Sequence, residues 1–147
     1  MQRLLPPLLF LVCVAAMALL NIYFPVVRLL DHPWTLIGLI DLAGGLVITL
    51  VAGMQFIRAR TNLKTFNKPD QLVTSGLFKY SRNPMYLGFV ISIFGVALYL
   101  GSLSPFLIFV LFILIADRWY IAFEEKMMAE IFGQAYEDYK KSVRRWI

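Results

Sequence analysis

Two residue types that carry much of enzyme chemistry are scarce in this chain. Its 147 residues include one cysteine and one histidine, Cys13 and His32. A single cysteine excludes a disulfide within the chain, and a lone histidine gives little support for a bound metal ion. The sequence also contains no glycine-rich loop of the dinucleotide- or phosphate-binding kind, and no strand pattern that could hold one. We therefore expect no metal site and no soluble nucleotide-binding fold.

Charge is scarce as well, and apolar residues dominate. Hydrophobic residues make up 60% of the chain and charged residues only 16%, and the mean hydropathy is +0.72, far from the values of a soluble globular domain. The apolar residues fall into blocks near the roughly 20 residues that cross about 30 Å of hydrocarbon. We therefore predict an all-α integral membrane protein of a single domain, residues 1–147, with four transmembrane helices over residues 4–24, 34–57, 85–100 and 103–122.

Basic residues orient these spans. They gather in two segments, between the second and third spans and after the fourth: Arg58, Arg60, Lys64, Lys68, Lys79 and Arg82, then Lys126, Lys140, Lys141, Arg144 and Arg145. By the positive-inside rule both segments are cytoplasmic, so we predict cytoplasmic N- and C-termini, in the inner membrane of a bacterium or an archaeon. The asymmetry and attraction to anionic lipids account for the net charge of +5. Since no recognition module is visible, nucleic acid is not an expected partner.

Small and helix-breaking residues add local detail. Gly44, Gly45 and Gly53 give the second span small faces for close helix packing. Pro84 fits the first turn of the third helix, where a missing N–H costs nothing. Asn83, just before it, is predicted to cap that helix with its side-chain oxygen.

Polar residues are brought together by a hairpin. The segment 101–105, Gly-Ser-Leu-Ser-Pro, predicts a tight reversal, so the third and fourth spans should be antiparallel neighbours. Arg118 and Glu124 then return to the membrane face that holds Arg82. An amphipathic cytoplasmic helix is predicted over residues 123–142. Such a crevice would offer a carboxylate, an arginine, a helix N-terminus and aromatic rings, which together suit the three parts of S-adenosylmethionine: adenine, ribose with a sulfonium, and an amino-acid carboxylate.

Two ordered motifs occupy residues 70–147. The first is the segment Gln71–Gly88, and the second, one hairpin later, is Glu124-Glu125 followed by Phe132-Gly133, Tyr136, Tyr139 and Arg145. In this order and at this separation they resemble the isoprenylcysteine carboxyl methyltransferase family and its phospholipid methyltransferase relatives. The resemblance implies S-adenosyl-L-methionine as methyl donor, bound at the cytoplasmic end of the last two spans and covered by the connecting loop and the C-terminal helix.

The resemblance also implies roles for single residues. Cofactor contacts fall on the loop, the start of the third span and the paired glutamates: Gln71, Leu72, Val73, Phe78, Asn83, Pro84, Met85, Tyr86, Glu124 and Glu125. The candidate catalytic residues are Arg82, Arg118 and Tyr120. Tyr120 stands where the prenylcysteine enzymes have an arginine implicated in acceptor binding, and Arg118 lies half a turn earlier. The family often has histidine at the position of Asn83, and asparagine cannot titrate near neutral pH, which argues against a general base there.

The expected function is S-adenosylmethionine-dependent methyl transfer to a lipophilic or membrane-borne acceptor that enters between helices from the bilayer. The acceptor group stays open among a carboxylate, a thiol and an amine, and the oligomeric state stays open too. Two other interpretations compete with this one. An NADPH-dependent reductase is possible because integral-membrane sterol reductases carry a similar Arg-Asn/His-Pro turn, and the third interpretation is a non-catalytic membrane module.

Overall fold

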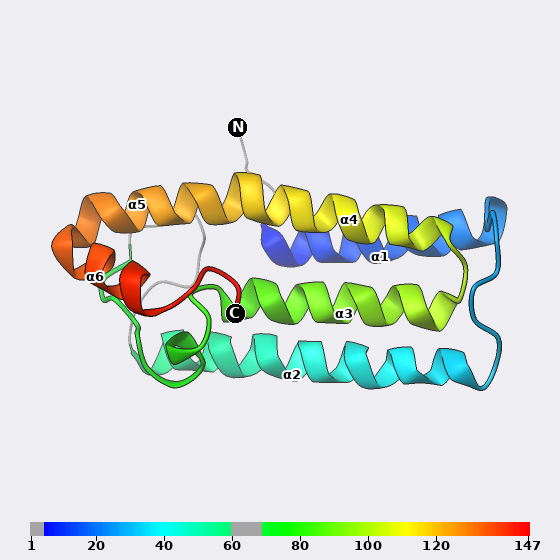
Figure 1. Cartoon of the computed structure of the whole chain (residues 1–147), viewed down its shortest axis with the longest axis horizontal. Helices are drawn as coiled ribbons and strands as arrows, with labels where there is room; N and C mark the ends of the chain where they lie inside the picture. The colour runs from blue at the N-terminus through cyan, green and yellow to red at the C-terminus, as the bar shows by residue number, and fades with distance from the viewer. Residues whose placement is uncertain (1–4, 60–68) are drawn as a thin grey trace.

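The structure is a computed structural model that describes residues 5–59 and 69–147, and these residues form helices joined by loops (Figure 1). The long helices are α1 Pro6–Tyr23, α2 Ile37–Arg58, α3 Pro84–Leu100 and α4 Ser104–Ile115. α4 continues through a π-helical stretch, η3 Ala116–Ile121, into α5 Ala122–Phe132, and α6 Gln134–Ser142 follows. Two short 3₁₀ turns complete the described elements, η1 Trp34–Leu36 and η2 Gly76–Lys79. The prediction of an all-α fold is confirmed.

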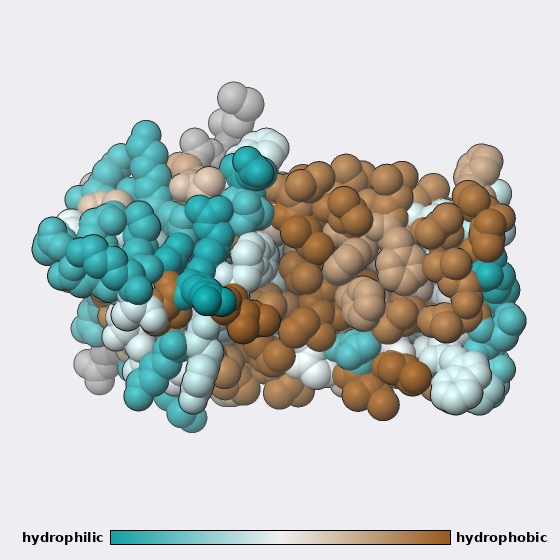
Figure 2. All heavy atoms as spheres, in the orientation of Figure 1, coloured by the Kyte–Doolittle hydropathy of each residue, from teal (hydrophilic) through white to brown (hydrophobic). Residues whose placement is uncertain are grey.

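The helices run side by side as an elongated bundle, with α3 between α2 and the pair α1 and α4 (Figure 1). Helical stretches over Pro6–Tyr23, Trp34–Arg58 and Ser104–Phe132 are long and apolar enough to cross a membrane, and α3 is a shorter apolar helix. On the face shown in Figure 2, apolar side chains cover the middle of the bundle, and most polar ones gather at the end that carries α5, α6 and the loop before α3, with a smaller polar group at the opposite end. The chain is therefore an integral membrane protein. A crossing by α3 as a fourth span stays a prediction.

Some predicted features lie outside the described residues or differ from the structure. Leu4, which begins the first predicted span, and the basic residues Arg60, Lys64 and Lys68 lie outside the described residues. The prediction of one amphipathic helix over residues 123–142 is wrong, because the chain turns at Gly133, where φ is +51°. L side chains rarely adopt this conformation, whereas glycine adopts it readily. The turn folds α6 back toward the start of α3 (Figure 1).

Glycine lets the backbones of α2 and α3 touch. Gly38 lies against Gly95, and Gly45, seven residues later on α2, lies against Gly88, seven residues earlier on α3. A Cβ atom built on Gly45 would stand 2.4 Å from the carbonyl oxygen of Gly88, and one on Gly38 would stand 2.2 Å from that of Gly95. No side chain fits in this seam. Helices in lipid associate through such close packing, since the hydrophobic effect gives little drive for their contact.

The two other predicted packing glycines are not in this seam. Nothing within 4 Å would meet a Cβ at Gly44, and at Gly53 the nearest atom is the flexible end of Met85 at 3.9 Å. The expected packing role of Gly44 is wrong, because it faces open space, and Gly53 lines the cavity beside Met85 in place of the seam.

The start of α3 is held differently from the prediction. Pro84 occupies the first turn as expected, but the Asn83 side chain makes no capping hydrogen bond. The Asn83 side-chain amide donates instead to the carbonyl oxygen of Arg145 at 3.0 Å, and the Asn83 N–H donates to the Ser81 hydroxyl at 3.1 Å. Asn83 therefore joins α3 to the C-terminal segment. At the other end, the predicted reversal is confirmed, since α3 ends at Gly101 with φ +73° and α4 begins at Ser104.

The adjacent glycines Gly44 and Gly45 give a matched pair of variants. Gly45→Ala should lower the free energy of unfolding by about 1–3 kcal/mol, the usual cost of overpacking, because the new methyl group meets the backbone of α3. Gly44→Ala places the same methyl group in open space on the same helix and should leave stability equal or slightly higher. Thermal unfolding in detergent measures both, and equal melting temperatures for the two variants would contradict the seam.

Candidate functional site

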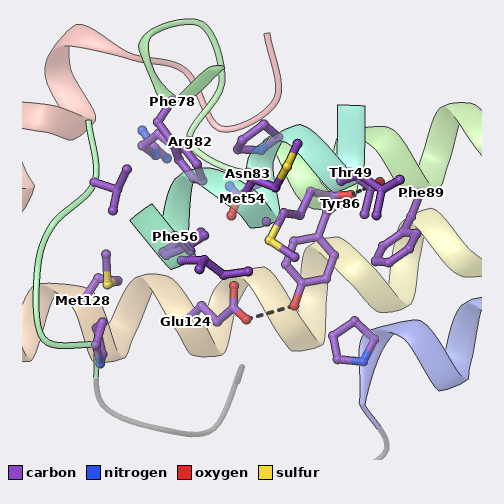
Figure 3. Close-up of a pocket in the computed structure, with 18 of the residues that line it drawn as sticks. Thr49, Met54, Phe56, Phe78, Arg82, Asn83, Tyr86, Phe89, Glu124 and Met128 are labelled. Atoms are coloured by element: carbon purple, nitrogen blue, oxygen red, sulfur yellow. Dashed lines mark hydrogen bonds between the residues drawn. The ribbon is translucent and has the colours of Figure 1, made fainter. Parts of the chain in front are cut away.

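A cavity of about 700 Å³ opens at the polar end of the bundle, between the C-terminal half of α2, the start of α3, α5 and the first residues of α1 (Figure 3). Its size falls in the range of small-molecule and cofactor sites. Its lining is mainly aliphatic, aromatic and methionine side chains. The polar side chains along it are Thr49, Arg82, Asn83, Tyr86, Glu124, Tyr136 and Tyr139.

One hydrogen bond joins the two sequence motifs across the cavity. Tyr86 lies in the first turn of α3, and its hydroxyl donates to Glu124 Oε1 on α5 at 2.9 Å (Figure 3). Tyr86 is buried, and its ring lies 6.2 Å from the ring of Tyr120, which belongs to the apolar core. The Glu124 carboxylate is thus held at the cavity by a phenol from the other half of the site.

The loop before α3 is clamped over the end of α2. The ring of Phe78 meets Phe56 edge to face at 5.0 Å, and the Gln55 side-chain oxygen accepts from the N–H of Leu77 at 3.2 Å. From the opposite side, the Tyr139 hydroxyl of α6 donates to the carbonyl oxygen of Phe78 at 2.6 Å. These contacts hold the ring of Phe78 at the wall of the cavity.

The guanidinium of Arg82 is engaged behind the cavity. Its Nη2 donates to Glu125 at 2.6 Å, and its Nη1 donates to the carbonyl oxygens of Val143 at 2.8 Å and Lys140 at 3.2 Å. Its buried Nε has no hydrogen-bond partner among the described residues. Figure 3 shows the guanidinium turned away from Tyr86, toward the C-terminal segment. The part of Arg82 that lines the cavity is therefore not its charged end.

Most of the predicted site residues meet at this cavity. Those that line it are Val73, Phe78, Arg82, Asn83, Pro84, Met85, Tyr86 and Glu124. Those that do not line it are Gln71, Leu72, Glu125, Arg118 and Tyr120.

Arg118 and Tyr120 on η3, the two residues predicted to contact the methyl acceptor, lie away from the cavity. The side chain of Arg118 is 83% exposed and lies beside Asp117, with 3.5 Å between Nε and Oδ2. Tyr120 is buried in the core that α1, α3 and α4 share. A π-helical stretch has more residues per turn than an α-helix, so it changes the direction of the side chains that follow it. Neither side chain lines the cavity, and the role of these two residues toward the acceptor stays a prediction from the resemblance.

Several contributors were not singled out from the sequence. Thr49 donates through its hydroxyl to the carbonyl oxygen of Met85 at 3.1 Å, which ties α2 to the start of α3 beside the cavity. Gln55 holds the loop through the N–H of Leu77. Tyr136 and Tyr139, which the second motif already contains, line the cavity from α6. Thr49 and Gln55 are polar residues in a mainly apolar span, and that exception was the available signal.

Comparison with known proteins identifies the family. The profile of the phospholipid methyltransferase family matches residues 33–135, which is more than half of the chain. The chain belongs to this family. The resemblance predicted from the two motifs is thereby confirmed, and the matched family segment includes the walls that α2, α3 and α5 contribute to the cavity.

Individual relatives are similar over part of their length. A protein-S-isoprenylcysteine O-methyltransferase of Schizosaccharomyces pombe is 38% identical over 77 residues, 52% of this chain and 33% of the relative. One of Dictyostelium discoideum is 30% identical over 136 residues, 82% of this chain and 51% of the relative. An uncharacterized protein of Haemophilus influenzae is 36% identical over 63 residues, 43% of this chain and 100% of that protein. The chain thus spans about a third to a half of the two methyltransferases.

The buried tyrosines of α6 carry shifted pKa values. Burial raises the pKa of Tyr139 to about 12, with Arg82 opposing the shift. Burial also raises the pKa of Tyr136, and the charge of Glu125 adds to the effect. Both phenols therefore keep their protons at neutral pH, as the donation from Tyr139 to Phe78 requires.

Tyr139→Phe should lower the free energy of unfolding by about 1 kcal/mol or more, because it leaves the Phe78 carbonyl without this donor. Since the folded pKa of about 12 lies above the ordinary value of 10.0, the stabilisation is complete below about pH 10 and is lost as the pH rises toward 12. Thermal unfolding between pH 7 and 11 should therefore show a smaller alkaline loss for Tyr139→Phe than for wild type. Tyr80→Phe, at a tyrosine that is 75% exposed, is the control and should match wild type throughout.

Proposed function

We propose that this chain is an S-adenosylmethionine-dependent methyltransferase that acts on a lipophilic, membrane-borne acceptor at the cytoplasmic face. The observation that carries the proposal is the hydrogen bond from Tyr86 to Glu124 inside a cavity of about 700 Å³. It unites both motifs of a methyltransferase family in one enclosed site. The similarity to protein-S-isoprenylcysteine O-methyltransferases supports the reaction class.

The residues at the cavity suit the cofactor. The Glu124 carboxylate can accept from hydroxyl or ammonium groups, and Phe78 offers an aromatic face for adenine. Residues Asn83 to Tyr86 bring the N-terminus of α3 to the cavity wall, where helix amides favour a carboxylate. When bound, S-adenosylmethionine supplies a methyl group already activated by the positive sulfonium. The chain's own task is then to hold the acceptor in line with that methyl group and to keep water away.

The acceptor is proposed to enter from the bilayer. Next to the polar wall, the cavity is lined by Pro6 and Pro7 of α1 and by Leu46, Leu50 and Met54 of α2. Leu50 and Met54 are also exposed on the outer surface, 65% and 46% respectively, so the apolar wall continues into the lipid-facing side. An acyl or prenyl chain can follow this wall while its polar head reaches the cofactor.

Positioning is the main source of rate in this proposal. Alignment of two reactants can supply on the order of 7 to 11 kcal/mol in favourable cases. A carboxylate or thiolate acceptor attacks the methyl carbon without a general base, whereas an ammonium group must first lose a proton. The proposal includes four membrane crossings with both termini in the cytoplasm of a bacterium or an archaeon, in line with the basic residues Lys79, Lys126, Lys140 and Arg144 at one end of the bundle.

Binding of S-adenosylhomocysteine tests the proposal directly. Calorimetry on detergent-purified wild type should show binding, and Glu124→Ala should abolish it. The isosteric Glu124→Gln should weaken it by about 1.5–3 kcal/mol, the usual worth of a hydrogen bond to a charged group. Glu130→Gln removes an exposed carboxylate from the same helix and serves as the control, with unchanged affinity expected.

Methyl transfer is the second readout. Wild type should move label from S-adenosylmethionine to a lipid-extractable acceptor, and Glu124→Ala should not. Binding of NADPH in place of S-adenosylhomocysteine would turn the assignment to a membrane reductase. Binding of neither compound by folded protein would favour a non-catalytic membrane module.

A further inference from the structure

The segment after α6 passes back along the start of α3 (Figure 1). Its backbone accepts four hydrogen bonds from the turn that begins α3, one of them from Arg82 Nη1 to the Val143 carbonyl oxygen at 2.8 Å. The Arg82 N–H donates to the Arg144 carbonyl oxygen at 3.0 Å, and the Asn83 side-chain amide and the Ser81 hydroxyl donate to the Arg145 carbonyl oxygen at 3.0 and 3.4 Å. Residues 143–146, the C-terminal strap, thus hold the turn on the side away from the cavity.

Four charged side chains fasten this strap to the helix η3–α5. Glu125 accepts from both Arg82 and Arg145, and Asp117 accepts from Arg145 Nη1 at 3.2 Å. The side chains of Arg82 and Glu125 are only 10% and 12% exposed. The cluster contains equal numbers of positive and negative groups. Removing one member would leave a partner charge buried without compensation, which is costly.

The two neighbouring glutamates face different partners. Successive residues on an α-helix point about 100° apart. Glu124 therefore turns to the cavity and meets Tyr86, while Glu125 turns to the strap and meets Arg82 and Arg145. Whatever fixes Glu125 also fixes the rotation of α5, and so the direction of Glu124.

We infer that Arg145 is a positioning residue for the proposed cofactor site. Its side chain fixes α5 through Glu125 and Asp117, and its carbonyl oxygen fixes Asn83 at the start of α3. One residue outside the cavity thereby sets the two walls of the cavity relative to each other. The predicted effect of Arg145 on cofactor binding rests on the proposed function. Its predicted effect on the turn before α3 rests on geometry alone.

The test compares three variants of the full chain in detergent. Arg145→Gln removes the charge, Arg145→Lys restores it without the two-sided guanidinium, and Lys141→Gln removes an exposed charge of α6 that pairs only with its neighbour Asp138 among the described residues. Three quantities are measured: the Kd for S-adenosylhomocysteine, the melting temperature, and hydrogen exchange in the peptide that spans residues 80–88.

Arg145→Gln should raise the Kd roughly tenfold to a hundredfold, the scale of affinity loss known for outer-shell residues that orient metal ligands. Arg145→Lys should recover part of this loss, and Lys141→Gln should behave as wild type. Exchange in the peptide 80–88 should be faster in Arg145→Gln than in the control. A lower melting temperature with unchanged Kd and unchanged exchange would overturn the inference, because Arg145 would then only stabilise the fold.

Two further outcomes are decisive as well. If wild type binds no S-adenosylhomocysteine, the proposed function fails, and hydrogen exchange in Arg145→Gln still tests the positioning role. Faster exchange confined to the peptide 80–88 supports that role of Arg145, and unchanged exchange overturns it. If Arg145→Gln does not fold, Asp117→Asn takes its place, since it keeps the contact between Arg145 and Glu125 and weakens the second anchor of Arg145. The new amide oxygen can still accept from the Trp146 indole N–H, which lies 3.0 Å from Asp117 Oδ1. Asp117→Asn should change Kd and exchange in the same direction by a smaller factor, and wild-type values for both would overturn the inference.

Discussion

Backbone contact between α2 and α3 is the constraint on which the rest of the site depends. Because Gly45 and Gly88 let the two helices touch, Thr49 can reach the carbonyl oxygen of Met85, and the last turns of α2 stand beside the first turn of α3. The cavity opens where this contact ends. A wider separation would carry Phe56 and the loop on it away from Glu124. The glycine seam thus determines the width of a site that lies at its polar end.

Ion pairs hold the polar end of the bundle together, in addition to the glycine seam. In lipid, an ionic group is costly, and a protein gathers such groups where they pair or reach water. Here Arg82, Glu125, Arg145 and Asp117 pair with one another next to the cavity. They neutralise each other, and the Glu124 carboxylate keeps its place in the cavity wall. The charged cluster and the cavity wall therefore use separate carboxylates, although the two are neighbours in the sequence.

Sequence reasoning was successful where a pattern depends on neighbouring residues. Four apolar blocks, the proline that opens α3 and the reversal after Gly101 could be read locally, and the two motifs identified the family. It failed where the partner is distant. Nothing near Asn83 in the chain shows that its amide meets Arg145 and leaves the helix uncapped, and the π-helical stretch that carries Arg118 and Tyr120 has no simple residue signature.

The adjacency of Glu124 and Glu125 limits how this chain can vary in length. Loops of a membrane bundle accept added residues at little cost, but one residue added within α5 before Glu124 would rotate both carboxylates by about 100°. Glu124 would then point toward the two arginines that now bind Glu125, and the added residue would take its place at the cavity beside Tyr86. Related chains can therefore differ freely between the helices, while the stretch from η3 to Glu125 should keep one fixed length.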